Sequence, residues 1–310
     1  MATINNYGDC STDTKGSGKL SCDKSYWGDL KGFGLLNKGI TWTITDGVVA
    51  ITEVDWTNKI KAASLFPYQN SYDYDSVGNE NEVNTSSTQI EKDVRAGLPK
   101  VQWMYADGNC RHASLWDKKG FDRWDLVLFY SNGMRLAHNT AQTRAKGFDA
   151  GNFSVQSETI QKGTDLQMST CSAQLKNADE FAVQNVFLTW TDLGFNALEI
   201  AGFNDVNITL DPIAAGTTFT ASIVSSCNTG SSILDLDDDA KYVLLGTQAS
   251  ATTISSVAYN ATTSKYTFTV SPALVGTDTV QIKLGDGTFN VVDDTLGNLY
   301  KGTSNTITVS

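Results

Sequence analysis

The alternation of apolar and polar residues is clearest in the middle of the chain. Residues 101–105, Val-Gln-Trp-Met-Tyr, alternate with a period of two, which is typical of a half-buried strand. Residues 124–130 and 134–138 are two further strand-like runs, and Asn132-Gly133 lies between them. Asn-Gly at this place predicts a β-hairpin with a type I′ turn, because both residues tolerate positive φ.

A short helix is predicted between this strand and the hairpin. It covers residues 110–118, where Leu115 and Trp116 can face a sheet, and Asn109 is its expected N-cap. The centre of the chain is therefore expected to fold as a strand, a helix and a hairpin. Nothing in its pattern is typical of an active site.

The segments before this centre differ in regularity. Residues 39–44 predict a strand that stops at Asp46-Gly47, and residues 52–64 have apolar positions at roughly helical spacing. Residues 1–38 are rich in Gly, Ser, Lys and Asp, and they predict an irregular N-terminal arm. Residues 68–97 are polar and acidic, and they predict a long loop that is either solvated or ordered by a partner.

The composition changes near residue 197. Before it, a polar interval at 139–151 is followed by strand-like runs at 153–160 and 181–190. All seven Trp, all five Arg and both His lie at or before residue 190, whereas the chain after residue 197 has four Lys and eleven acidic residues. This change predicts two domains, residues 1–196 and residues 197–310.

The second domain consists of short apolar runs separated by turn residues, which is typical of an immunoglobulin-like β-sandwich. The runs are residues 206–210, 218–225, 242–245, 253–259, 266–270, 280–284, 289–292 and 306–309. The disulfide and core Trp of antibody domains are absent from this part of the sequence, so only the architecture is predicted. The predicted fold class is mainly β, a two-sheet sandwich or barrel with one or two short flanking helices, followed by the Ig-like sandwich.

Composition and charge narrow the function classes. With 40% hydrophobic and 18% charged residues, the chain is expected to fold, and it has no run of about 18 apolar residues that could span a membrane. The first residues lack the basic head and apolar core of a secretory signal, so a cytoplasmic site of synthesis and assembly is expected. A net charge of −11 argues against sequence-specific nucleic-acid binding, but it is compatible with a wall that DNA passes without sticking.

Histidine and cysteine offer two weak candidate sites. His112 or His138 could form a Ser-His-acid triad, but no G-x-S-x-G motif accompanies them. Cys110 and His112, with Cys10 and Cys22, could bind zinc, but the spacing is unusual for zinc ligands. The simpler interpretation is that all the cysteines are reduced thiols, packed as small apolar groups.

The acidic turns of the second domain suggest calcium binding as a third candidate. Asp235, Asp237, Asp238 and Asp239 lack the glycine and the terminal Glu of an EF-hand, so a solvated acidic turn is the better interpretation. Asp286-Gly287 and Asp293-Asp294 are interpreted as turns in the same way. Nucleotide-binding motifs are absent from the sequence, and core packing is the better explanation of Trp42, Trp103, Trp124 and Trp190. We therefore predict no catalytic, cofactor-binding or metal-binding residue.

The order of elements carries a resemblance to a known family. It comprises the strand ending at Asp46-Gly47, the helical residues 55–63 running into Leu65-Phe66-Pro67, the polar loop, residues 101–105, the 110–118 helix and the hairpin through residues 131–134. In this order the first 190 residues resemble the major tail (tail tube) proteins of long-tailed bacteriophages, above all those from phages of Bacteroidetes hosts. Residues 1–38 and 139–180 match poorly. The C-terminal part is similar to bacterial Ig-like domains, in which a D-x-x-G-N turn, here residues 294–298, precedes the last strand.

The resemblance implies a particular assembly. Two packed antiparallel sheets with a flanking helix would form each subunit, and six subunits would join edge strands into a closed barrel. The rings would stack into a tube, and genomic DNA would pass through its lumen without specific binding. The 68–97 loop would contact the next ring, and residues 126–138 would contribute to the shared wall, with outward-facing residues against the neighbouring subunit. The Ig-like domain would decorate the outside and make weak contact with the host surface.

The expected function is therefore that of a non-enzymatic virion structural protein of the tail. Its further partners would be other tail proteins, such as a terminator, baseplate or sheath protein, and it would be assembled in the host cytoplasm. Two alternatives stay open: another virion component, such as a capsid decoration or tail terminator, and a glycan-binding adhesin module. A glycan hydrolase has less support, because no carboxylate pair stands out from the acidic background.

Overall fold

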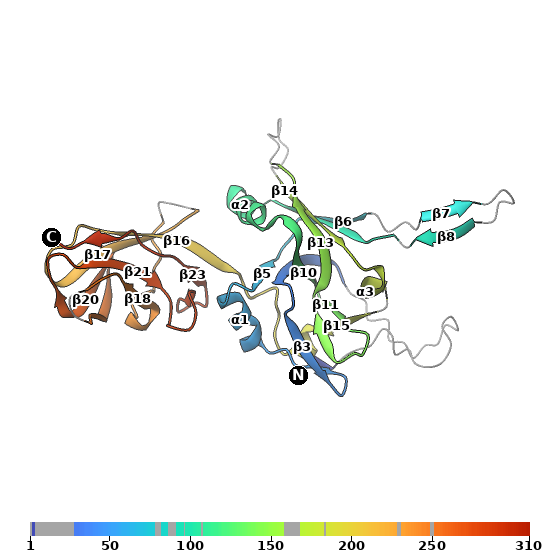
Figure 1. Ribbon diagram of the computed structural model, residues 1–310, viewed down its shortest axis with the longest axis horizontal. Helices are drawn as coiled ribbons and strands as arrows, with labels where there is room; N and C mark the ends of the chain where they lie inside the picture. The colour runs from blue at the N-terminus through green and yellow to red at the C-terminus, as the bar shows by residue number, and fades with distance from the viewer. Residues whose placement is uncertain are drawn as a thin grey trace. The chain divides into compact units, whose positions relative to one another are not determined.

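The computed structural model describes residues 2–3, 28–77, 82–85, 91–95, 97–106, 108–157, 168–182, 184–227, 231–248 and 251–310. The chain divides into two compact units, the first comprising Met1–Thr57 and Ser64–Ile200 and the second Asn58–Ala63 and Ala201–Ser310 (Figure 1). Strands make up most of the regular structure, so the predicted mainly β class is confirmed. Among the described residues, no helix is long and apolar enough to cross a membrane.

The first unit is built on a curled sheet whose main path runs β1-β4-β3-β12-β11-β10-β13-β14-β9-β6. In this order the strands are Ala2–Thr3, Val48–Val49, Thr41–Thr45, Arg144–Lys146, Gly133–His138, Gly120–Tyr130, Phe148–Val155, Ser169–Leu175, Lys100–Tyr105 and Asp73–Val77. Off this path, β15 (Asn185–Thr189) pairs with β11, β2 (Leu30–Asn37) with β10, and β5 (Leu65–Tyr68) with β2. A separate hairpin consists of β7 (Glu82–Thr85) and β8 (Glu91–Arg95). The helices are α1 (Glu53–Lys61), whose residues 58–61 are counted with the second unit, α2 (Asn109–Lys118), α3 (Ala178–Ala182) and α4 (Trp190–Leu193).

Strand β10 lies at the centre of the first unit (Figure 1). On one edge its first half pairs with β13 and its second half with β11, while on the other edge it pairs with β2 from Trp124 to Tyr130. A strand that changes partner along its length lets the sheet bend from one layer to the next. Residues 124–130 are all buried, as expected for a strand that is covered on both faces.

The two faces of β10 contribute to different parts of the core. Leu126 and Leu128 belong to a cluster that includes Phe33 and Trp103, whose ring centroids lie 4.3 Å apart. On the opposite face, the ring of Phe129 lies 5.9 Å from that of Trp56 in α1. Alternation along one strand therefore supplies side chains to both layers.

The aromatic residues of the first unit largely occupy the places predicted for them. Trp42, Trp103 and Trp124 are buried in the core, and Trp42 stacks on Trp56 with ring centroids 6.1 Å apart. Trp190 differs, because it begins α4 rather than lying in a strand, and its indole N–H donates to the Ser131 carbonyl at 3.2 Å. The expected core role therefore holds for three of the four predicted tryptophans.

The central hairpin is confirmed, but only its turn residues Ser131 and Asn132 are exposed, and its paired strands do not face outward. All six residues of β11 are buried, as are residues 124–130 of β10. Partners within the same chain cover them, since β15 pairs with β11 from Gly133 to Ala137 and β2 covers the free edge of β10. The prediction that this hairpin presents residues to a neighbouring subunit is therefore wrong.

The hairpin turn lies one residue earlier than predicted. Tyr130 pairs with Gly133, so Ser131 and Asn132 form the two-residue loop and Gly133 begins β11. The glycine serves another purpose, because a Cβ atom there would lie 2.3 Å from the carbonyl oxygen of Leu188 and 2.7 Å from the ring of Phe187. Its lack of a side chain allows β15 to approach β11 closely.

Replacing Gly133 with Ala is expected to destabilise the first unit by about 1–3 kcal/mol, because the contacted atom is backbone and cannot rotate away. Urea unfolding followed by tryptophan fluorescence measures this directly, since all seven Trp precede residue 191. Gly120→Ala is the matched control, because its new Cβ would meet only the Arg123 side chain at 3.9 Å. Equal unfolding midpoints for the two variants would contradict the role assigned to Gly133.

Two segments that were predicted to be irregular contain strands. The N-terminal arm of residues 1–38 includes β1 and β2, and the 68–97 loop includes β6, β7 and β8. In β2, apolar residues point to both faces, so Leu35 and Leu36 are both buried and no alternation is visible. Residues 4–27 and most of the turns in the second segment lie outside the described residues.

The predicted helices and turns of the first unit are partly confirmed. The predicted helices correspond to α1 and α2, and Asp46-Gly47 forms the β3–β4 turn with positive φ at both residues. The predicted N-cap is wrong, because Gly108 occupies that position and Asn109 is already helical. Strands β12 and β14 and helix α3 were not predicted.

The second unit consists of a six-stranded and a three-stranded sheet that pack around a shared core. The first has the order β19-β20-β17-β16-β23-β22, with bounds Thr253–Asn260, Lys265–Leu274, Gly216–Ser225, Phe203–Leu210, Leu299–Lys301 and Val292–Asp293. The second has the order β18-β21-β24, with bounds Tyr242–Leu245, Thr279–Leu284 and Ile307–Thr308. Each of the eight predicted runs overlaps one of these strands, and only β23 was missed. Phe268 and Tyr242, from opposite sheets, meet edge to face with ring centroids 4.9 Å apart.

Candidate interaction surface

Strand β6 forms an open edge of the first unit. It pairs with β9 from Asp73, opposite Met104, to Val77, opposite Lys100, and no described strand pairs with its other side. The backbone N–H of Tyr72 donates to the Met104 carbonyl at 2.8 Å, so Met104 faces β6 and its partner Asp73 directs its N–H toward β9. The N–H groups of Tyr74 and Ser76 therefore point away from β9. That of Tyr74 donates to Asp73 Oδ1 at 2.8 Å, and that of Ser76 points to the open edge, where another strand could pair with it.

The side chains of this edge are unusual for a surface exposed to water. Tyr74 is opposite Trp103 and therefore points to the same face, yet Trp103 is fully buried while Tyr74 is 44% exposed. Tyr72 beside it is 64% exposed. The core layer of the sheet thus ends at Tyr74, whose ring is open to solvent, and Tyr72 adds a second exposed ring. We call Tyr72, Asp73, Tyr74 and Asp75 the acidic edge.

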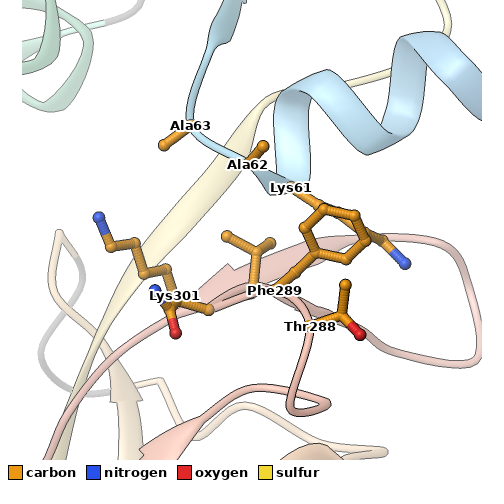
Figure 2. A pocket seen from close by; sticks show the side chains of 8 residues that line it. Lys61, Ala62, Ala63, Thr288, Phe289 and Lys301 are labelled. Atoms are coloured by element: carbon orange, nitrogen blue, oxygen red, sulfur yellow. The ribbon is translucent and has the colours of Figure 1, made fainter.

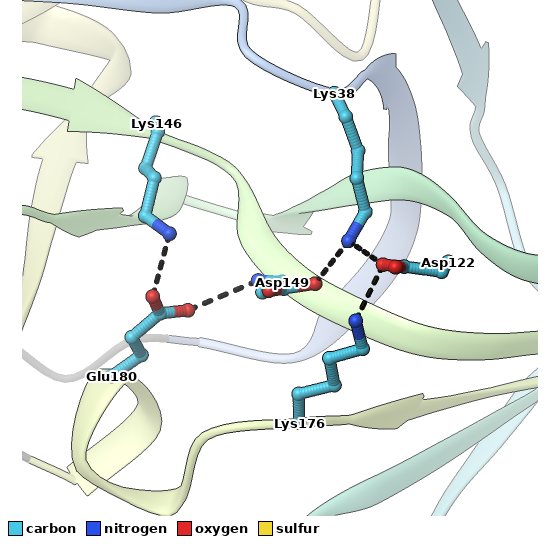
Figure 3. Close-up of polar contacts among 6 residues, drawn as sticks. All are labelled: Lys38, Asp122, Lys146, Asp149, Lys176 and Glu180. Carbon is cyan, nitrogen blue, oxygen red and sulfur yellow. Dashed lines mark hydrogen bonds and ion pairs between the residues drawn. The ribbon is translucent and has the colours of Figure 1, made fainter.

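A network of ion pairs joins β10, β12, β13 and α3 with the residues that directly follow β2 and β14 (Figure 3). Lys38 contacts Asp122, and it lies 2.5 Å from Asp149. Lys176 also contacts Asp122 at 2.5 Å. Glu180 of α3 is the most buried member of the network. It accepts Lys146 Nζ at 2.6 Å and the backbone N–H of Asp149 at 3.0 Å, which anchors α3 to the sheet.

Two carboxylates of β10 have pKa values shifted in opposite directions. Asp125 is buried, and desolvation raises its pKa to about 6, although Lys146 and the Gly39 backbone N–H oppose the shift. Asp122 is exposed, and hydrogen bonds from Lys176 and Lys38 lower its pKa to about 2. The same network therefore holds one carboxylate that resists ionisation and another that favours it.

Replacing Asp125 with Asn is expected to stabilise the first unit near neutral pH. The native pKa of about 6 exceeds the unfolded value of about 3.9, so wild-type stability falls as pH rises from about 4 to about 6, by at most about 3 kcal/mol. An asparagine side chain there would keep an acceptor for the Gly39 N–H and would not ionise. Urea midpoints between pH 4 and pH 8 should show a flatter profile for this variant.

Asp122→Asn is the matched control for the pH profile. Because the native pKa of Asp122 lies below its unfolded value, its contribution is present above about pH 4 and is lost as pH falls toward 2. This variant should lose stability at neutral pH and keep the wild-type slope between pH 4 and pH 6. A stabilising effect of both substitutions at pH 7 would argue that net charge, and not burial of Asp125, governs the profile.

The two histidines are not placed as parts of a triad. His138 is buried in β11, and its Nδ1 lies 2.8 Å from the Asn139 carbonyl oxygen. The ring of His112 in α2 lies 5.8 Å from that of Trp116, and its buried Nδ1 has no hydrogen-bond partner in the described part of the chain. Neither imidazole is paired with a carboxylate among the described residues. The geometry therefore gives no support to the triad hypothesis.

The cysteines differ from the prediction of uniformly reduced thiols. Cys110 and Cys227 are disulfide-bonded, so the prediction is wrong for these two residues. A disulfide sulfur is not a thiolate ligand, which removes Cys110 from the proposed zinc site. Cys10 and Cys22 lie outside the described residues. Cys171 of β14 is free and buried, and desolvation raises the pKa of its thiol.

The acidic residues of the second unit mainly organise turns. Asp238 accepts the backbone N–H of Ala240 at 3.0 Å, and Asp286 accepts those of Thr288 and Phe289. Asp294 accepts the N–H groups of residues 296 and 298. The turn interpretation is therefore confirmed for Asp286 and Asp294. Among the described residues, no group of three or more His, Cys, Asp or Glu is placed to hold a metal ion.

A pocket of about 260 Å³ lies among residues of the second unit (Figure 2). Lys61, Phe289 and Lys301 contribute to its wall, which also contains Thr288, Asn290 and three small or branched apolar residues. Lys61 is paired with Asp293 at 3.3 Å, and Lys301 lies over the ring of Phe203 at 5.3 Å. No described carboxylate, histidine or cysteine lines the pocket, so its lining offers no general acid–base pair.

The acidic edge was missed because its alternation is hidden within a polar segment. Residues 72–75, Tyr-Asp-Tyr-Asp, do alternate with a period of two, which is the signal that could have revealed β6. Comparison with known proteins adds no identification: no family model matches the chain, and no curated protein gives a significant match.

Proposed function

We propose that this chain is a structural protein of a bacteriophage tail, whose copies join into hexameric rings that stack into a tube. The observation that carries the proposal is the open β6 edge, with its outward N–H groups and its exposed tyrosines. An edge of this kind favours pairing with another chain. In the described part of the chain, this edge carries no Lys, Pro or covering element, and its charged residues are Asp73 and Asp75. The element order of residues 40–138 also supports the proposal.

Closing a ring would satisfy the edge in every subunit. Each contact would bury the rings of Tyr72 and Tyr74, and burial of a large apolar side chain is worth about 1.5–3 kcal/mol. A heterologous contact repeated around an axis generates a closed ring, and stacking of rings generates a filament. Strand pairing supplies further hydrogen bonds, as in recognition by strand addition.

The charge of the chain fits the passage of DNA through the tube. A net charge of −11 disfavours binding to a polyanion, so the genome would slide through the lumen without specific contacts. The second unit would decorate the outer surface, where it could touch the host surface weakly. Terminator, baseplate or sheath proteins would be the further partners in the virion tail.

Electron microscopy tests this function. Negative-stain images of the purified full-length protein at high concentration, and of the virion from which it comes, should show hollow tubes built of six-fold rings. Immunogold labelling of the virion with antibodies against the second unit should decorate the tail. A protein that stays monomeric at high concentration, together with unlabelled tails, would rule the proposal out.

A further inference from the structure

A second surface of the first unit combines cations with exposed aromatic rings. It lies where α2 ends and β10 begins, and we call Trp116, Lys119, Phe121 and Arg123 the cationic corner. Phe121 is 82% exposed and Trp116 is 37% exposed. Two large apolar rings so close together in the sequence, both open to solvent, are more than the isolated exposure common on protein surfaces.

The cations of this corner are held over rings and not by carboxylates. Lys119 Nζ lies 3.4 Å from the centroid of the Trp116 ring, and the Arg123 guanidinium lies 4.6 Å from that of Trp124. Neither forms an ion pair with a described carboxylate. Asp122, the acidic residue between Phe121 and Arg123, is neutralised by Lys38 and Lys176. Two fixed positive charges are therefore available to an acidic partner.

The cationic corner and the acidic edge lie at opposite ends of one run of strands. The order β10-β13-β14-β9-β6 contains four strand spacings of about 4.8 Å, so the two edges lie roughly 19 Å apart along the sheet. Residues 120 and 121 pair with β13, whereas pairing with β2 begins only at Trp124. The first residues of β10 thus face outward on the side away from β6.

The two surfaces are complementary in charge and similar in aromatic content. Asp73 and Asp75 are exposed and form no ion pair with a described cation, and Tyr72 and Tyr74 supply apolar surface next to them. A heterologous contact requires that each molecule carry both halves of the interface on different faces. This chain carries both within the first unit.

We propose that the acidic edge of one copy docks on the cationic corner of the next copy. The inference rests on the proposed function and names the surface that β6 meets. Asp73 and Asp75 face Lys119 and Arg123, and the tyrosines pack against Trp116 and Phe121. Opposite charges orient the contact head to tail, and the aromatic rings supply most of the buried surface.

Charge reversal on each side provides the test, using full-length protein throughout. The corner variant, Lys119→Glu with Arg123→Glu, and the edge variant, Asp73→Lys with Asp75→Lys, should each stay monomeric at concentrations at least tenfold above those at which the wild type associates. An equimolar mixture of the two should associate again, because each variant's altered surface then meets an oppositely charged partner. Sedimentation velocity and negative-stain microscopy measure both results.

The control variant, Lys241→Glu with Lys283→Glu, changes the net charge by the same amount in the second unit and should associate like the wild type. Tryptophan fluorescence unfolding shows whether each variant is folded. Normal rings from the corner variant would overturn this inference and leave the tube function standing. If the wild type forms no rings, the proposed tube function fails, but the mixture still tests the contact between copies. Association in the mixture alone supports this contact. No association in any sample overturns it.

Discussion

A proline at position 128 is expected to unfold the first unit and thereby to abolish assembly. Leu128 is buried in β10, opposite Phe33 of β2 on one side and Arg135 of β11 on the other. Proline has no N–H to donate and fixes φ, which costs about 3 kcal/mol or more inside regular structure. The lost packing of the leucine side chain adds about 2–5 kcal/mol. Together these losses rival the whole stability of a typical domain.

Two spectroscopic signals separate the units in this experiment. Tryptophan fluorescence reports only the first unit, because the chain has no Trp after residue 190. It should show no cooperative transition in Leu128→Pro, while circular dichroism should retain a strand signal from the second unit. Leu128→Ala should unfold cooperatively with a loss of about 2–5 kcal/mol. Leu296→Ala is the matched control, since Leu296 is 80% exposed and its truncation should change stability by no more than about 0.5 kcal/mol.

This substitution does not probe an interface directly. The hairpin was expected to meet a neighbouring subunit, but β2 and β15 cover it within the same chain. A wild-type fluorescence transition in Leu128→Pro would show that β10 is not the strand on which the first unit depends.

The elements that could be predicted from the sequence are those with one buried face. Strand β9 alternates strictly, with Val101, Trp103 and Tyr105 buried and the residues between them partly exposed, and its position was predicted within one residue. The strands of the second unit behave in the same way, as in β21, where every second residue is buried. Period-two alternation identifies such strands because one face packs and the other is solvated.

The elements that were missed violate this condition. Strand β2 is buried on both faces, and its glycines allow close contacts that no hydrophobic pattern records: a Cβ at Gly32 would lie 2.1 Å from the Tyr68 carbonyl oxygen. Strand β6 was missed for a different reason. Its residues alternate between tyrosine and aspartate, so the segment looks polar and no apolar face is visible in the sequence. Its exposure depends on the absence of a neighbouring strand among the described residues, which is a property of the sheet order and not of the local sequence.

The candidate surface was predictable only in part. The resemblance to tail tube proteins suggested that edge strands join subunits, but it placed the shared wall at the central hairpin. The Tyr-Asp-Tyr-Asp segment became a candidate only when its register against β9 set Tyr74 on the same face as Trp103. The cationic corner needed the structure as well, because Lys119 and Trp116 are brought together at the end of α2.

Replacing Ser76 with Pro is expected to prevent ring assembly while leaving the subunit folded. The N–H of Ser76 points away from β9, so proline removes a donor from the open edge without breaking a bond of the β6–β9 ladder. Each subunit contact then loses one strand-pairing hydrogen bond of about 0.5–1.5 kcal/mol and meets the bulk of the ring. A loss of this size weakens each contact about tenfold, and a closed ring of six contacts multiplies the effect.

Ser76→Ala separates the backbone contribution from the change of side chain. It keeps the outward N–H, so it should assemble like the wild type at both ionic strengths, whereas the proline variant should fail to assemble at any salt concentration. Light scattering against protein concentration at two ionic strengths compares the variants, and tryptophan fluorescence confirms that each is folded. If folded Ser76→Pro forms tubes as readily as the wild type, strand addition at β6 does not build the ring, and the contact between copies must lie elsewhere on the first unit.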